Sequence, residues 1–179
     1  MKKTLFLIAL GLFLTFNATK SYAVVIGTKV SGVPVISISS SAMNAQLSAL
    51  SGSGFSAIVL ISMSLTPTIS GNGIFTVEFS YLPPGGLVEL HVAKCIITCV
   101  YNAGTNEYIA TQGDNMYCCD NVNCSGCTAT TEGGCSSCTA TNPDTISRCK
   151  VQSHMTTEYP LWGPTFITFL NSLEMWLKS

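Results

Sequence analysis

The clearest pattern of hydrophobic and polar positions is a two-residue alternation over residues 75–81. Every second residue there is large and apolar: Phe75, Val77, Phe79 and Tyr81. This period predicts a β-strand with one face in a core. Pro83-Pro84-Gly85-Gly86 predicts a turn, and a second alternation over residues 88–93 predicts the returning strand of a hairpin, with His91 on its polar face. We expect this strand to continue through residues 95–101.

The residues before this hairpin suggest strands and one helix. Residues 24–38 are rich in β-branched side chains and predict two short strands, interrupted near Ser31-Gly32. Residues 39–50 predict a short helix behind a serine N-cap. Residues 55–64 form an almost unbroken apolar run, which favours a strand buried on both faces. Either a β-α-β crossover or an antiparallel sheet with a helical insertion fits this order.

The C-terminal residues predict an amphipathic helix. From Pro164 onward the apolar residues recur at helical spacing: Phe166, Phe169, Leu170, Leu173, Trp176 and Leu177. We expect the helix to cover the sheet, with packing on another subunit or on a membrane as alternatives. Lys178 is the one cation on its polar face, which disfavours the membrane alternative.

The first 23 residues predict a secretory signal. Lys2 and Lys3 precede a 13-residue apolar run, and Ser21-Tyr22-Ala23 predicts cleavage after Ala23. An uncleaved anchor is the alternative, but a spanning helix needs roughly 20 apolar residues. After cleavage we expect a secreted or cell-surface protein that makes no membrane contact.

Seven of the nine cysteines lie in residues 113–150, a stretch without a large aliphatic run. In an exported chain, disulfides are the default state of cysteine. The disulfide candidates are therefore Cys95, Cys99, Cys118, Cys119, Cys124, Cys127, Cys135, Cys138 and Cys149. Nine is an odd number, so one thiol stays unpaired or joins two chains. The sequence favours Cys149 or Cys135 for that role, without deciding the connectivity.

The adjacent Cys118 and Cys119 point in different directions, and each therefore needs its own partner. Cys95 and Cys99 are natural candidates for these partners. They share one face of a strand, about 13 Å apart, which is too far for a bond between them.

Two C-x-x-C pairs, Cys124 to Cys127 and Cys135 to Cys138, allow three interpretations. A zinc ribbon usually has about 15–20 residues between its pairs, whereas seven separate these. A thiol–disulfide exchange site needs a helix start, which Thr-Ala-Thr does not favour. Loops closed by disulfides remain the preferred interpretation, and we expect no metal and no cofactor.

Other candidate sites in the cysteine-rich stretch are weaker. The carboxylates of Asp114 and Asp120 offer calcium ligands, but their spacing lacks the regular loop pattern, and turn formation is the alternative. Asn123-Cys124-Ser125 matches an N-glycosylation sequon. His91 and His154 stand in no catalytic motif, so we expect no enzymatic activity.

Charge excludes one class of partner. Without the signal the chain has five basic and nine acidic residues, a net charge of −4. Nucleic-acid binding needs clustered Lys and Arg, so we expect no nucleic-acid partner. Charged residues make up 9% of the chain, compared with about 25% in ordinary soluble domains. Such a surface favours either self-association or a domain solubilised by hydroxyl groups.

Cys-Ser-Gly-Cys-Thr-Ala-Thr at 124–130 returns as Cys-Ser-Ser-Cys-Thr-Ala-Thr at 135–141. This pair resembles the C-x-x-C repeats of cysteine-rich surface antigens of protists, over about 30 residues of the chain. The resemblance implies a secreted or cell-surface coat component without catalysis.

The sequence thus predicts an α+β fold, mainly an antiparallel β-sheet with a disulfide-rich lobe and a C-terminal helix. We divide it into a signal (1–23), a β-rich core (24–112), a cysteine-rich lobe (113–150) and a connection with the helix (151–179). The predicted function is structural or recognition, with an extracellular protein, a glycan or a second copy as partner. A filament or coat subunit and a thiol-active protein are the alternatives. The predicted contact residues are Tyr108, Tyr117, Tyr159 and Trp162.

Overall fold

The computed structural model describes residues 23–85, 89–122, 124–125, 127–132, 135–136, 139–140, 148–152 and 163–179, with the backbone alone at 124–125, 139–140 and 148–152. The elements in chain order are β1 (Val25–Val30), β2 (Val33–Ile36), α2 (Ser40–Leu47), the 3₁₀ helix η1 (Ser48–Ser53), β3 (Ser56–Pro67), β4 (Gly73–Leu82), β5 (His91–Asn102), β6 (Glu107–Ile109), β7 (Met116–Val122), β8 (Cys124–Ser125), β9 (Thr139–Ala140), β10 (Arg148–Gln152) and α3 (Gly163–Lys178). These elements confirm the predicted α+β class.

The long strand β5 is the centre of the main sheet. One of its edges pairs with β4, and the other pairs with β7 along its first half and with β6 at its end. Beyond these lie β3 next to β4, β10 next to β7, and β1 followed by β2 next to β6. All of these pairings between described strands are antiparallel, so the β-α-β crossover is not formed. Because β7 and β10 belong to this sheet, the cysteine-rich stretch is partly built into the core.

The local predictions for the N-terminal half hold. The β1–β2 turn places Ser31 and Gly32 at φ 51° and 83°, the left-handed values of a tight two-residue hairpin turn. Ser39 caps α2, because its Oγ accepts a hydrogen bond from the Ala42 N–H at 3.1 Å. Met43 and Leu47 of this helix are buried.

The prediction that residues 55–64 form a strand buried on both faces is wrong. Within the described residues β3 pairs with β4 alone, which makes it an edge strand of the sheet. Val59 and Ile61 are 56% and 51% exposed. A continuous apolar run favours a strand, but it does not say whether other elements cover both faces of that strand.

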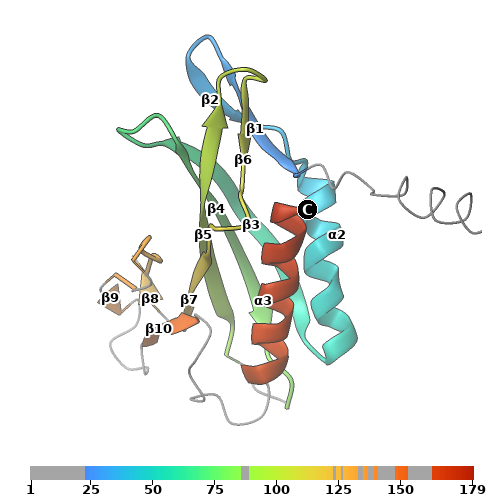
Figure 1. Ribbon diagram of the computed structural model, residues 1–179. Helices are drawn as coiled ribbons and strands as arrows, with labels where there is room; N and C mark the ends of the chain where they lie inside the picture. Colours follow the sequence, from blue (N-terminus) through green and yellow to red (C-terminus); the bar gives the residue numbers. More distant parts are fainter. Residues whose placement is uncertain are drawn as a thin grey trace, which may run out of the picture.

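One face of the sheet, which we call the inner face, is covered by α2 and α3 (Figure 1). The four alternating residues of β4 all lie on it and are each at most 1% exposed, as predicted. Phe166 of α3 stacks on Tyr81 with ring centroids 4.7 Å apart, and Phe169 meets Phe79 edge-on at 6.2 Å. The amphipathic face of α3 therefore covers the sheet, as expected. Of the helices in the described residues, none has both the length and the apolar character needed to cross a membrane.

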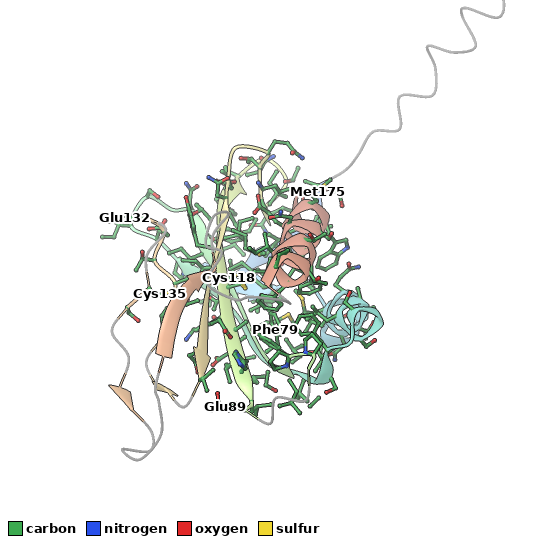
Figure 2. The ribbon with its side chains drawn as sticks, turned by 90° about the horizontal axis from the view of Figure 1, so that it is seen from below. Phe79, Glu89, Cys118, Glu132, Cys135 and Met175 are labelled. Carbon is green, nitrogen blue, oxygen red and sulfur yellow. A yellow bond between two sulfur atoms is a disulfide. The ribbon has the colours of Figure 1, made fainter. Side chains whose placement is uncertain are left out.

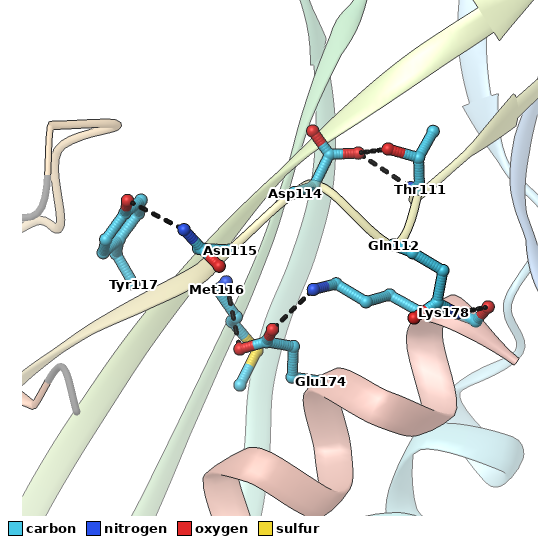
Figure 3. Close-up of polar contacts among 8 residues, drawn as sticks. All are labelled: Thr111, Gln112, Asp114, Asn115, Met116, Tyr117, Glu174 and Lys178. Carbon is cyan, nitrogen blue, oxygen red and sulfur yellow. Dashed lines mark hydrogen bonds and ion pairs between the residues drawn. The ribbon is translucent and has the colours of Figure 1, made fainter.

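Polar contacts hold the end of α3 to the segment before β7 (Figure 3). Glu174 accepts a hydrogen bond from the Met116 N–H at 3.2 Å and forms an ion pair with Lys178 at 2.6 Å. The Gln112 side chain donates to the Lys178 carbonyl at 3.2 Å. Two of these contacts join α3 to the chain at Gln112 and Met116, and the ion pair within the helix holds the Glu174 carboxylate in place.

The N-terminal hairpin returns close to β3 and β4. A Cβ at Gly73 would lie 2.9 Å from Leu65 Cδ1 and 3.0 Å from the Tyr108 ring, and one at Gly27 would lie 2.6 Å from the Val35 carbonyl. Gly27 requires glycine because the clash is with backbone, whereas a side chain at Gly73 would force Leu65 and the Tyr108 ring to shift. Leu65 packs across the two glycines and joins β1 to the β3–β4 pair.

Candidate functional site

The adjacent Cys118 and Cys119 fasten the two faces of the sheet. Cys118 lies directly opposite Cys95 in the β5–β7 ladder, with Cα atoms 4.0 Å apart, and the two form a disulfide on the inner face. Cys119 points to the other face, which we call the outer face, and forms a disulfide with Cys135. The prediction that these neighbours take different partners is confirmed, and so is the prediction that Cys95 is the partner of one of them.

Cys135 belongs to a small hairpin, which we call the cysteine hairpin and define as the described part of residues 124–140. β8 pairs with β9, and Ala129 pairs with Cys135 in the same register. Thr128 and Ser136 tie its arms together, because each backbone N–H donates across the hairpin at 2.8 Å, to the Ser136 Oγ and to the Thr128 carbonyl. The two copies of the sequence repeat are therefore the two antiparallel arms of one hairpin.

The cysteine hairpin lies against the outer face over a small apolar cluster. Ile96, Cys119, Cys127 and Ala129 are buried there, and Ile74, Tyr117 and Cys135 pack around them. Figure 2 shows Glu132 and Cys135 to one side of the sheet, while Phe79 lies between the sheet and the helices. So few buried groups cannot hold the hairpin by themselves, and the Cys119–Cys135 disulfide supplies the attachment.

Cys127 is also disulfide-bonded, and its sulfur lies within 4.8 Å of the sulfurs of Cys119 and Cys135. In the described residues this is the one group of three side chains close enough to hold a metal ion. All three sulfurs are oxidised, whereas zinc needs thiolates. The arrangement therefore fits paired disulfides and does not fit a zinc site.

Cys99 is the free thiol among the described cysteines, and it is fully buried. The prediction that Cys99 forms a disulfide with a cysteine of β7 is therefore wrong. The prediction that Cys135 is the unpaired cysteine is wrong as well. β7 ends its pairing with β5 at Ile97, so among the described strands none from the cysteine-rich stretch lies beside Cys99. The other predicted odd thiol, Cys149, has a side chain outside the described residues, as does Cys124, and Cys138 lies outside them entirely.

The environment of Cys99 suppresses its reactivity. Burial raises the pKa of the thiol to about 12, with a further rise from the negative charge of Asp114 and an opposing effect of a hydrogen bond to the Phe75 backbone. The sulfur lies 3.7 Å from the Ile97 carbonyl. A thiolate is the reactive form, so this cysteine cannot act as a nucleophile at neutral pH.

A buried histidine–carboxylate pair lies at the other end of β5. His91 Nδ1 is 2.8 Å from Asp120 Oδ2, and the two side chains are 6% and 0% exposed. The Tyr81 ring lies 5.3 Å from the imidazole. The prediction that His91 lies on the polar face of its strand is wrong, because β5 turns His91 and Ala93 inward and Val92 outward.

Sequence reasoning missed this pair, since its members stand 29 positions apart and meet only through the β5–β7 register. A histidine with a carboxylate can act as a general base when substrate reaches it. This histidine–carboxylate pair is buried beside the Tyr81 ring of the core, so the pair serves to hold β5 and β7 together.

The carboxylate of Asp114, the other calcium candidate, accepts hydrogen bonds from the Thr111 N–H and hydroxyl at 2.7 Å and 2.8 Å, as a turn-forming residue does.

The predicted contact residues do not form one surface. Tyr108 is fully buried against Tyr101, with ring centroids 4.9 Å apart, which contradicts its assignment as a ligand contact. Tyr117 is half-buried at the edge of the outer cluster. Tyr159, Trp162 and the sequon residue Asn123 lie outside the described residues.

Two open clefts border the edge strand β3. The first, of about 410 Å³, is lined by residues of α2 and η1 on one side and by residues 55–58 on the other. The second, of about 370 Å³, is lined by residues of β2 and α2 on one side and by residues 60–63 on the other. Asn44 lines both. Their walls carry hydroxyl, amide and aliphatic groups, which suits an uncharged occupant.

No family model matches this chain, and neither a curated protein nor a solved structure with significant similarity was found.

Proposed function

We propose that this protein is a secreted or cell-surface structural or recognition protein without enzymatic activity, stabilised by disulfides. The observation that carries the proposal is the cysteine hairpin, which is held on the outer face mainly by the Cys119–Cys135 bond. A protein built in this way needs an oxidising environment, since cytosolic thiols are kept reduced. The predicted signal at residues 1–23 supports the same environment.

The same hairpin supports a recognition role. Its turn presents Thr131 and Glu132 as exposed groups, on a base fixed to a rigid sheet. Loops on a rigid scaffold are the usual carriers of binding function. An extracellular protein or a glycan is the partner class that this small polar surface suits.

The proposal is tested by non-reducing peptide mass mapping of the protein recovered from its native cell surface or medium. We expect an N-terminus at Val24, the bonds Cys95–Cys118 and Cys119–Cys135, and a free thiol at Cys99. Recovery of the protein from the cytosol, with Met1 retained and the cysteines reduced, would contradict the proposal.

Thiol–disulfide activity is the enzymatic alternative, because three sulfurs lie together on the outer face. Cys119 and Cys127 are 0% and 4% exposed, which keeps a protein substrate away from them. We expect no turnover in an insulin-reduction assay, and catalytic reduction at a rate above that of free thiol would favour the alternative.

Assembly into a filament or coat is the second candidate function. The observation that favours it is the exposed edge of β3, on which the next inference depends.

A further inference from the structure

The uncharged character of one long segment singles out a surface of this protein. Between Lys29 and Glu78, residues 30–77 contain no Asp, Glu, Lys, Arg or His. This segment forms β2, α2, η1, β3 and the first part of β4. The nearest charged residues along the chain are Lys29, at the end of β1, and Glu78, in the middle of β4.

The same segment carries most of the exposed large apolar side chains. Nine such residues occur in the described part of the chain, and six of them lie within residues 30–77: Val30, Val33, Val35, Val59, Ile61 and Ile69. Val59 and Ile61 stand on β3, a 12-residue edge strand. An edge strand of this kind presents unpaired backbone N–H and C=O groups beside exposed apolar groups, which is a template for strand addition.

Natural edge strands are usually protected by charge, proline or bulges. β3 has no charge, and its one proline is the last residue, Pro67. It does have bulges, between Ser56 and Val59 and between Leu60 and Ser62. Glu78 accepts a hydrogen bond from Ser62 at 3.2 Å, but it lies on β4, one strand inside the edge. Within β3 itself bulges are therefore the one protective feature, and two open clefts separate its residues 56–58 and 60–63 from α2, η1 and β2.

We infer that β3 pairs antiparallel with β3 of a second copy of this chain, forming a twofold dimer through a continuous sheet. A strand is self-complementary in this arrangement, because the same surface serves both copies. The charge distribution favours a second copy as the occupant. Without the predicted signal the chain has a net charge of −4, so two copies repel each other overall. The uncharged segment is the side on which they meet without that repulsion.

The test is analytical ultracentrifugation of the purified protein over a wide concentration range. We expect a monomer–dimer equilibrium, and we expect Val59→Lys to raise the dissociation constant at least about tenfold, because it adds a positive charge to the same paired edge in both copies. Val33→Lys is the matched control, since Val33 is an equally exposed strand valine at 62% on the four-residue strand β2. It should leave the equilibrium unchanged.

A monomer at all concentrations overturns the inference, and so does a dimer that the two substitutions affect equally. Hydrogen exchange on the unsubstituted protein provides an independent measurement if Val59→Lys fails to fold. Amides of residues 57–63 should become more protected as concentration rises, whereas those of β2 should not. Uniform protection would assign the contact to another surface. Sedimentation is independent of peptide mapping, so failure of the dimer leaves the proposed secretion and disulfides standing.

Discussion

The inner and outer faces of the sheet are stabilised in different ways. On the inner face two helices bury a continuous core of large apolar side chains, and the Cys95–Cys118 disulfide lies within it. On the outer face the cysteine hairpin covers four buried residues and is attached through Cys119–Cys135. The neighbouring residues Cys118 and Cys119 of β7 thus form disulfides that differ in importance. The bond of Cys118 adds to a core that apolar packing already stabilises, whereas the bond of Cys119 holds the cysteine hairpin where little apolar packing is present.

The largest effect should come from emptying the inner core. Phe79 is fully buried and contacts the rings of Tyr81, Phe166 and Phe169. Phe79→Ala should lower the free energy of unfolding by about 3–5 kcal/mol, the usual cost of such a cavity. Urea unfolding followed by circular dichroism measures it. Val100→Ala is the control, because Val100 is 38% exposed and should cost far less. Equal losses would show that the inner face is not the main core.

The next effect should appear when the outer disulfide is removed. Cys119→Ala with Cys135→Ala opens a loop of 16 residues, and a loop of about 15 residues accounts for roughly 3 kcal/mol in the chain-entropy model. Both cysteines must be replaced, because a single free thiolate would lie within 4.8 Å of the Cys127 sulfur and could exchange with its bond.

Hydrogen exchange measures where this loss falls. Amides of residues 127–132 should lose protection, whereas those of β4 and β5 should keep theirs. A loss spread evenly over the sheet would mean that the outer bond also supports the core, and the contrast between the faces would fail.

The sequence predicts the inner face much better than the outer one. The strand at 73–82, the helix at 163–178 and the hairpin of β1 and β2 follow from local periodicity, turn residues and caps, which short stretches of sequence contain. The partner of Cys119, the burial of His91 with Asp120 and the edge position of β3 depend on which strands lie side by side. Strand order is set by the whole chain, and for that reason the predictions for Cys99 and Tyr108 were wrong.

Cys99 offers a pH-dependent test of the inner core. Its pKa is about 12 in the folded protein, against 9.0 for a cysteine thiol exposed to water. Between these values the unfolded chain releases the proton and the folded chain keeps it, so stability falls as pH rises through this window. The slope from this group is at most about 1.4 kcal/mol per pH unit. Cys99→Ala should flatten stability between pH 9 and 10.5 relative to the unsubstituted protein. Parallel pH profiles would mean that Cys99 is exposed to water.

The smallest effect separates two roles of Glu174 at the end of α3. Its Oε1 pairs with Lys178 four residues later on the helix, and its Oε2 accepts a hydrogen bond from the N–H of Met116, the first residue of β7. An exposed i,i+4 ion pair contributes about 0.3–0.5 kcal/mol, but these two side chains are only 8% and 13% exposed, so Lys178→Ala should cost more than that because it leaves a largely buried carboxylate without its cation. A charged hydrogen bond to a backbone group contributes about 1.5–3 kcal/mol. Glu174→Ala, which also removes the contact with Met116, should cost about 1–2 kcal/mol more than Lys178→Ala. Glu174→Gln keeps an acceptor for Met116 and should fall between them. If the two alanine variants unfold at the same urea concentration, the contact with Met116 does not hold the helix on the sheet, and the inner face depends on apolar packing alone.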